Sequence, residues 1–414
     1  MSAAWVYLLL AAWGATGTFI AFTRGRRPPS LGALYFILAF PVAELPLHHV
    51  ALSAVVTALF AASGVFEAWP GLAGLVLVIA SWAALLVMHT RSLRSQAAID
   101  HGLQETLGAH FFEAIRPEYA GSLKAGAPLP AWINPFRLHD RECVIQVRNL
   151  AYGPAGRRNR LDVYHPREPA QGRPVLLQIH GGAWIFGRKD DQGLPLMDEM
   201  ARQGWVCVAP NYRLSPRATF PEHLVDCKLA IRWIRENIAS YGGDPAFIAV
   251  TGGSAGGHLA TLVALTANEP EYQPGFEDVD TSVVAAVPFY APYDFLEHNG
   301  VKSEDVHEPS FVEKLVMKSS PREERDDWER ASPIRRVHAG APPFFVLHGS
   351  HDSLVWAENA RRFVAALREV SPRPVAYAEL PGAQHAFDIV QSIRCVHAVN
   401  GVAAFLAWVR STRA

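Results

Sequence analysis

Residues 249–262 read AVTGGSAGGHLATL and place a serine in a pattern that can do covalent chemistry. Gly252, Ser254 and Gly256 form a G-x-S-x-G motif, preceded by an apolar β-rich run and followed by an Ala/Leu-rich helical pattern. This context predicts a sharp strand-to-helix turn, which needs neighbours without a Cβ and leaves the serine at a helix N-terminus. The free amide of Ala255 would stabilise a developing negative charge there. We therefore expect Ser254 to act as a nucleophile.

A serine nucleophile needs a base close to it and an acid that orients the base. In an α/β sheet these groups lie on loops at the carboxyl ends of strands. Asp352 follows the strand-like run at 344–347, and His385 follows the run at 375–380. The order Ser254, Asp352, His385 is the nucleophile–acid–histidine order that accompanies this motif. The sequence therefore predicts a catalytic triad.

Other residues and other roles are also compatible with parts of this pattern. His348 and His351 also lie near the acid, but they precede or touch Asp352 in sequence and suit the position of the base poorly. Asp352 alone could cap a helix, and His385 alone could lie on a surface loop. Their joint placement after two strands favours the catalytic interpretation.

Backbone donors for an oxyanion are predicted directly after another strand. The sequence HGGAW at 180–184 follows the apolar run at 175–179. Glycines let the main chain approach a carbonyl oxygen, so the amides of Gly182 and Ala183 can point at it together with that of Ala255. We expect these three amides to form an oxyanion hole.

Alternating strand and helix patterns follow Cys143 and would position these groups. Alternating patterns at 143–147 and 161–164 predict two antiparallel edge strands, and apolar runs predict buried strands at 175–179, 206–209, 248–250, 283–287, 344–347 and 375–380. Helical patterns occur at 221–240, 258–267, 355–370 and 392–410. This order predicts an α/β fold, a doubly wound, mostly parallel sheet, over 141–414. The charged stretch at 292–342 interrupts it, and we expect a lid-like insertion there.

Residues 1–90 have a different composition and predict an all-α transmembrane region. Ala3–Phe22 and Ala68–Thr90 contain no Asp, Glu, Lys or Arg, and Leu31–Phe66 is apolar apart from Glu44. Each run is long enough to cross a hydrocarbon core of about 30 Å as a helix. We expect about three transmembrane helices, with Glu44 paired to a neighbouring helix or close to an interface.

Basic residues indicate the orientation of these helices. Arg24, Arg26 and Arg27 follow the first run, while Arg91 and Arg94 follow the last. Three crossings place both clusters on one side, which the positive-inside tendency makes cytoplasmic. The sequence therefore predicts an outside N-terminus and a catalytic domain on the cytoplasmic face of a membrane.

The segment at 91–140 begins with apolar residues at helical spacing and ends in a stretch rich in Gly and Pro. We expect an amphipathic helix and a linker, which would lie at the membrane interface or cap the site. The net charge of −1 gives no signature of nucleic-acid binding. The four cysteines contain no C-x-x-C pair, so we expect free thiols and no metal site.

From Cys143 to Ala414 the chain resembles the α/β-hydrolase esterases of the hormone-sensitive lipase type. The matching segments are HGGAW at 180–184, NYRLSPRATFP at 211–221, YGGDPAFIAVTGGSAGGHLA at 241–260, HGSHDSLV at 348–355 and GAQHAF at 382–387. The resemblance implies the same triad and oxyanion donors. The chain departs from the family pattern at two positions. Gly253 stands where the family often has Asp, and Ala183 stands where the family often has a third glycine. The resemblance does not extend to residues 1–90.

These observations together predict a membrane-anchored serine carboxylic-ester hydrolase, an esterase or lipase. It would act through an acyl-enzyme on a lipophilic or other small-molecule ester, with the lipid bilayer as its other partner. No metal or organic cofactor is expected. Trp184 and Phe186 would help to line the substrate pocket. The alternatives are an amidase, peptidase or thioesterase with the same triad, or a non-catalytic binding domain on a hydrolase scaffold.

Overall fold

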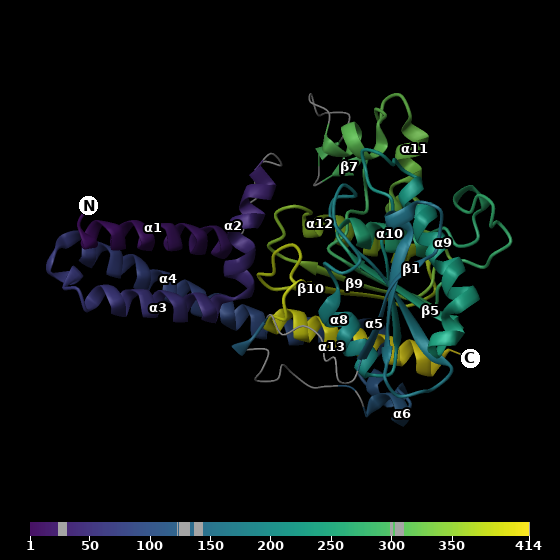
Figure 1. Cartoon of the computed structure of the whole chain (residues 1–414), viewed down its shortest axis with the longest axis horizontal. Helices are drawn as coiled ribbons and strands as arrows, with labels where there is room; N and C mark the ends of the chain where they lie inside the picture. Colours follow the sequence, from purple (N-terminus) through teal and green to yellow (C-terminus); the bar gives the residue numbers. More distant parts are fainter. Residues whose placement is uncertain are drawn as a thin grey trace.

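The computed structural model describes residues 1–23, 31–121, 123, 133–135, 144–298, 301–302 and 310–413. It consists of a group of N-terminal helices beside a larger α/β domain, with the N-terminus at the far end of the helical part (Figure 1). Cys143 and the basic cluster Arg24, Arg26 and Arg27 lie outside the described residues.

An eight-stranded sheet forms the centre of the α/β domain, in the order β1-β2-β4-β3-β5-β6-β9-β10. The pairs β1/β2 and β2/β4 are antiparallel, and all the others are parallel. This arrangement confirms the predicted mostly parallel sheet with two antiparallel edge strands. The strands are β1 (Val144–Ala151), β2 (Arg160–Pro166), β3 (Arg173–Ile179), β4 (Val206–Pro210), β5 (Gly243–Gly253), β6 (Ala285–Phe289), β9 (Phe344–Gly349) and β10 (Val375–Leu380).

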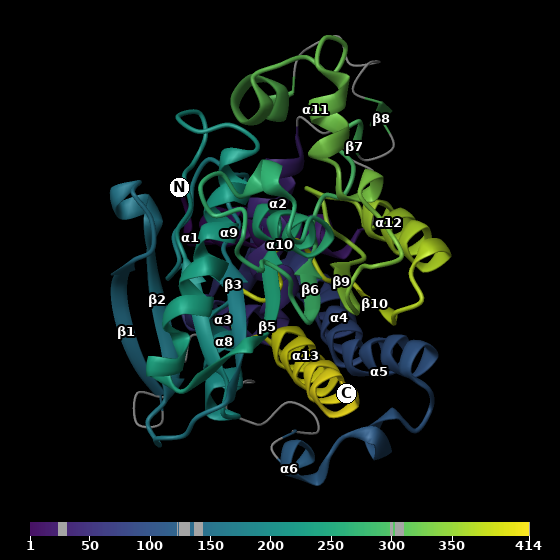
Figure 2. The ribbon, with the colours of Figure 1, turned by 90° about the vertical axis from the view of Figure 1, so that its right-hand side faces the viewer.

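Helices cover both faces of this sheet, as the doubly wound pattern predicts (Figure 2). One face packs against α9 (Glu222–Asn237), α10 (Ala255–Leu265) and α12 (Ala357–Val370). The other packs against α5 (Ser95–Leu107), α8 (Leu194–Arg202) and α13 (Ile393–Thr412). The central strands β3, β4, β6 and β9 are buried on both sides, which explains their apolar sequences, whereas the edge strand β1 is only partly buried.

The amphipathic helix expected at 91–140 is α5, and it belongs to one of these layers. Its residues Ile99 and Leu103 are buried in the core formed with α8 and α13. A Cβ on Gly102 would lie 2.0 Å from the carbonyl oxygen of Tyr377 in β10, so the helix backbone touches the sheet. After α5 the chain continues through a 3-10 helix, Phe111–Ala114, and α6 (Pro117–Ala120).

The insertion expected at 292–342 leaves the sheet after β6 and projects from one end of the domain (Figure 2). It contains a small hairpin of β7 (Glu297–His298) and β8 (Val301–Lys302), a π-helix at Val312–Met317, α11 (Arg325–Arg330) and a 3-10 turn at Pro333–Arg335. Its role as a lid stays a prediction. Further 3-10 turns occur at Gly156–Asn159, Ile238–Tyr241 and Pro270–Tyr272.

Within the described residues, the N-terminal region contains four α-helices, and the middle one of the three expected crossings is divided into two of them. They are α1 (Ala3–Phe22), α2 (Gly32–Glu44), α3 (Pro46–Ala61) and α4 (Trp69–Leu93), with a 3-10 turn at Val65–Glu67. The stretch Leu31–Phe66 is broken at Leu45, where α2 and α3 meet at 86°. Pro46 explains the break, because proline disfavours helical backbone at the preceding residue.

Three of these helices lie side by side, and α2 crosses their inner end next to the α/β domain (Figure 1). Tyr7 of α1 exchanges a hydrogen bond with Thr57 of α3 at 3.0 Å, and Trp82 of α4 donates to Ser53 of α3 at 2.7 Å. By length and composition, Ala3–Phe22 and the continuous helical stretch Trp69–Leu107 could each cross a membrane. The bent pair α2 and α3 would count as a third span only if taken together.

Candidate active site

Ser254 occupies the turn between β5 and α10, as the motif predicts. Its backbone angles are φ 57° and ψ −122°, a strained combination for a residue with a side chain. The Ser254 amide donates to the carbonyl of Phe289 in β6 at 2.9 Å, and its carbonyl accepts the His258 amide at 2.9 Å. These bonds hold the turn in place, so the serine is fixed at the carboxyl end of the central strand.

Asp352 and His385 come from the loops after β9 and β10 and are brought together at the same edge of the sheet. The Nδ1 atom of His385 donates to Oδ2 of Asp352 at 2.7 Å. Gln384 ties the two loops, because its Oε1 accepts the amides of Ser353 at 2.7 Å and of His385 at 2.9 Å. With Nδ1 donating to the carboxylate, Nε2 of His385 is the nitrogen that can accept a proton.

The environment of Asp352 keeps it ionised. Burial alone would raise the pKa of this carboxyl, but the charge of His385 and hydrogen bonds from His348 and His385 outweigh that effect and lower the pKa. Its Oδ1 also accepts the amides of Leu354 at 2.9 Å and Val355 at 2.8 Å. His348, which could have competed for the role of base, is instead fully buried and contacts Oδ2 at 3.3 Å.

His351, the other competing histidine, points toward the N-terminal helices. Its Nδ1 atom is 3.5 Å from the carbonyl oxygen of Ala21 in α1. His385, by contrast, contacts Oδ2 of Asp352 at 2.7 Å, closer than His348 does at 3.3 Å.

The three amides expected to bind an oxyanion are not used by the internal hydrogen bonds of the fold. In the described part of the chain, the amides of Gly182, Ala183 and Ala255 donate to no protein acceptor. The amide of Gly181, in contrast, donates to Oε1 of Gln192 at 2.7 Å, which anchors the loop. A Cβ on Gly181 would lie 3.2 Å from Cβ of Ser254, so this loop lies directly against the nucleophile turn.

The two aromatic residues expected to line the pocket have different positions. Trp184 is 3% exposed and packs edge-on against His258 and Phe295, with ring centroids 5.1 and 5.3 Å away. Phe186 is 63% exposed and lies over the loop, since a Cβ on Gly182 would touch its ring at 3.0 Å. Only Phe186 therefore presents its side chain at the surface.

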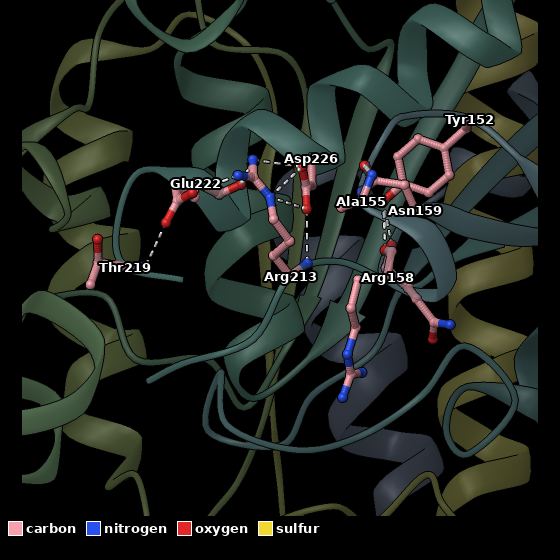
Figure 3. Close-up of polar contacts among 9 residues, drawn as sticks. Tyr152, Ala155, Arg158, Asn159, Arg213, Thr219, Glu222 and Asp226 are labelled. Atoms are coloured by element: carbon pink, nitrogen blue, oxygen red, sulfur yellow. Dashed lines mark hydrogen bonds and ion pairs between the residues drawn. The ribbon is translucent and has the colours of Figure 1, made fainter. Parts of the chain in front are cut away.

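A polar network of Arg213, Glu222 and Asp226 fixes the segment at 211–221 (Figure 3). Arg213 binds Asp226 through its backbone amide at 2.8 Å and its guanidinium at 2.9 Å, and it also pairs with Glu222. Ser215 then donates its amide to the carbonyl of Trp184 at 2.8 Å. The segment at 211–221 therefore connects α9, through Arg213, to the loop that carries the free amides, through Ser215.

The end of β6 contributes a residue that the sequence did not indicate as part of the site. The Tyr290 ring lies 4.6 Å from the His385 ring, and its hydroxyl donates to Asp388. A Cβ on Gly253 would be 2.5 Å from the Tyr290 hydroxyl, so Tyr290 fills the space beside the residue that precedes the nucleophile. No local motif marks this tyrosine.

Within the described residues, no group of three or more His, Cys, Asp or Glu side chains is placed so that it could hold a metal ion. Cys207, Cys227 and Cys395 are buried free thiols, as expected.

Comparison with known proteins identifies the relatives of this architecture. A family model described as BD-FAE matches residues 161–367. The chain is 46% identical over 327 residues to the probable carboxylic ester hydrolase LipM of Mycobacterium tuberculosis, covering 77% of this chain and 72% of the relative. It is 48% identical over 277 residues to the esterase LipQ of the same organism, covering 66% of this chain and 65% of the relative.

A solved structure supports the fold. The truncated form of a carbohydrate esterase from gut microbiota has a TM-score of 0.55 and 23% identity, covering 65% of this chain and 99% of that chain. At this identity the likeness shows the fold alone. Together with the sequence relatives, it confirms the resemblance to α/β-hydrolase esterases.

Proposed function

The chain belongs to the BD-FAE family and is a carboxylic ester hydrolase of the α/β-hydrolase fold; we propose that it acts through Ser254, His385 and Asp352. We further propose that it is attached to a membrane and acts on a lipophilic ester. The observation that carries the catalytic part is the Asp352–His385 pair at 2.7 Å, at the same sheet edge as a strained serine turn and three free amides.

Each group has a defined step. Nε2 of His385 takes the proton of the Ser254 hydroxyl as its oxygen attacks the ester carbonyl. The carbonyl oxygen becomes negatively charged and accepts hydrogen bonds from the amides of Gly182, Ala183 and Ala255. The C–O bond to the alcohol then breaks, and His385 gives its proton to the leaving oxygen. A water molecule then attacks the acyl-enzyme as His385 takes its proton, and His385 returns a proton to the Ser254 oxygen as the acid is released. Asp352 orients the imidazole in both half-reactions.

Membrane attachment is supported by the surface of the N-terminal helices. Large apolar side chains are exposed along α1, α3 and α4, including Trp13, Leu59, Val76 and Ile79. Such a surface is unfavourable in water and suited to lipid. The N-terminus lies at the end remote from the α/β domain (Figure 1), and Arg91 lies in the last turn of α4, from which the chain continues into that domain. We therefore place the catalytic domain on the cytoplasmic face.

The test compares the wild-type chain with Ser254→Ala in the membrane fraction after alkaline carbonate washing. We expect p-nitrophenyl ester hydrolysis to sediment with the membranes, and Ser254→Ala to lower it by at least about 10³-fold. A fluorophosphonate probe should label only the wild type.

Other outcomes are equally informative. Hydrolysis that survives Ser254→Ala would contradict the assigned nucleophile. Activity released into the supernatant by carbonate would contradict membrane integration. A folded wild type that reacts with the probe but hydrolyses no ester would favour amide or thioester substrates.

A further inference from the structure

The helix α2 is attached to both loops that carry the acid and the base. At its N-terminal end, the Ser353 hydroxyl donates to the carbonyl of Gly32 at 3.3 Å, next to Asp352. At its C-terminal end, Glu44 accepts from Ser392 at 2.8 Å and pairs with Arg394 at 3.0 Å, shortly after His385 in the chain. The helix therefore lies across the catalytic edge of the domain, and its position is fixed at both ends.

Close packing confirms that α2 is seated against the acid loop. A Cβ on Gly32 would lie 2.8 Å from the carbonyl oxygen of Ser353, so the two backbones are in contact. Arg394 also donates to the carbonyl of Ala43 at 2.6 Å. Glu44 and Arg394 are 4% and 1% exposed, so this attachment is shielded from water.

The middle of α2 brings one aromatic ring to the base. Phe36 lies edge-on to His385, with ring centroids 5.9 Å apart and an angle of 87°. Phe40, one turn later, packs on Phe36 at 5.5 Å and supports its ring. Phe36 remains half-buried, so part of its ring is available to a bound molecule.

The reaction geometry tells which part of an ester would meet this ring. His385 must donate its proton to the leaving alcohol oxygen, so the alcohol portion lies on the His385 side of the site. Phe36 adjoins His385 on α2, whereas Phe186 lies over the oxyanion loop. An apolar ring on the leaving-group side favours an apolar alcohol.

We propose that Phe36 is a specificity-determining residue that contacts the alcohol portion of the ester, so that this enzyme prefers esters of lipophilic alcohols. The inference rests on the proposed esterase function. It gives the N-terminal region a part in substrate recognition, because the wall of the leaving-group site is built from the same segment that carries the membrane helices.

The experiment measures kcat/KM of the full-length chain in detergent on two ester series. The first is acetate esters of linear alcohols from ethanol to octanol, and the second is p-nitrophenyl esters with acyl chains from two to ten carbons. Phe36→Ala should lower the octyl-to-ethyl preference about tenfold. It should leave the chain-length profile of the acyl series unchanged, since that series has one fixed alcohol.

Two further variants control for folding and position. Phe36→Leu keeps an apolar side chain and should give an intermediate preference even if the alanine variant is unstable. Ile37→Ala removes a neighbouring side chain of α2 that is 65% exposed, and it should change neither series. Labelling by a fluorophosphonate probe reports whether the triad of each variant is assembled.

The outcomes separate this inference from the proposed function. An equal fall in both series would overturn it, because Phe36 would then only position His385. An altered acyl profile with an unchanged alcohol preference would also overturn it. If the wild type itself hydrolysed neither series while reacting with the probe, the proposed esterase function would fail first.

Discussion

At the scale of single residues, Tyr290 explains the departure at Gly253. The family often has Asp before the nucleophile, but here the Tyr290 hydroxyl would be 2.5 Å from a Cβ at this position. Tyr290 is in turn held by its hydrogen bond to Asp388, a carboxyl whose pKa is raised by burial. A glycine at 253 therefore makes room for a ring that packs on the catalytic histidine.

Gly253→Ala should consequently impair both stability and turnover. The added methyl group must displace the Tyr290 ring, and overpacking of this kind destabilises by about 1–3 kcal/mol. Because that ring lies 4.6 Å from His385, we also expect kcat on short esters to fall about tenfold or more. Thermal unfolding and steady-state kinetics measure the two effects.

Gly14→Ala is the matched control, since a Cβ at Gly14 meets nothing within 4 Å. It should leave both quantities unchanged. A Gly253→Ala variant as stable and active as the wild type would show that Tyr290 is free to move aside.

The residues of the site differ in how far the sequence could predict them. Ser254 belongs to a local motif, and Asp352 and His385 each follow a recognisable buried strand, so their meeting follows from the parallel sheet. Tyr290 and Phe36 have no such signal. Their places at the site depend on tertiary packing between segments that are far apart in sequence.

At the scale of elements, the break between α2 and α3 determines what the N-terminal region can do. Leu45 has φ −124° and ψ 46° and turns the chain by 86°, so α2 runs in a different direction from α3, with Phe36 against His385. Pro46 was visible in the sequence and indicates a helix boundary. The partner of Glu44 could not be predicted, because Arg394 lies 350 residues away.

The buried pair Glu44–Arg394 should be essential for holding α2. Glu44→Gln leaves the Arg394 guanidinium buried without a charged partner, and we expect a loss of about 3–5 kcal/mol in the free energy of unfolding. The double variant Glu44→Leu/Arg394→Met removes both charges and should recover much of that loss. Chemical denaturation of the detergent-solubilised chain gives the comparison.

An exposed pair of the same kind provides the control. Arg325 and Glu329 in α11 lie 3.1 Å apart at the surface, so Glu329→Gln should change stability by less than about 1 kcal/mol. If Glu44→Gln were no more destabilising than Glu329→Gln, the ion pair would not be what fixes α2.

At the scale of the whole molecule, buried histidines link folding to pH. Burial lowers the pKa of His180 to about 4, of His258 to about 4 and of His223 to about 3. These rings are neutral in the folded chain, and His258 donates to the carbonyl of Ala331 at 2.7 Å. The unfolded chain binds protons at these sites below a pH of about 6.5.

Stability should therefore fall as the pH is lowered from about 6.5 toward 4. A histidine with a lowered folded pKa contributes stability that is complete above its unfolded pKa and is lost as the unfolded form takes up protons. Asp352, whose pKa is also lowered, adds to the loss only below its unfolded value of 3.8. The raised pKa of Asp388 has the opposite effect, because it makes the folded chain more stable as the pH falls. This single contribution is opposed by those of the three histidines.

The contribution of one histidine can be isolated with His258→Gln. Glutamine can still donate to Ala331 but does not titrate, so the variant should be less stable at pH 7.5 and have a flatter decline toward pH 4.5. His110→Gln changes a histidine on the surface and should retain the full wild-type slope. Unfolding midpoints measured from pH 4.5 to 7.5 give the comparison. If the midpoints of His258→Gln and His110→Gln declined in parallel, burial of a neutral imidazole would not account for the acid sensitivity.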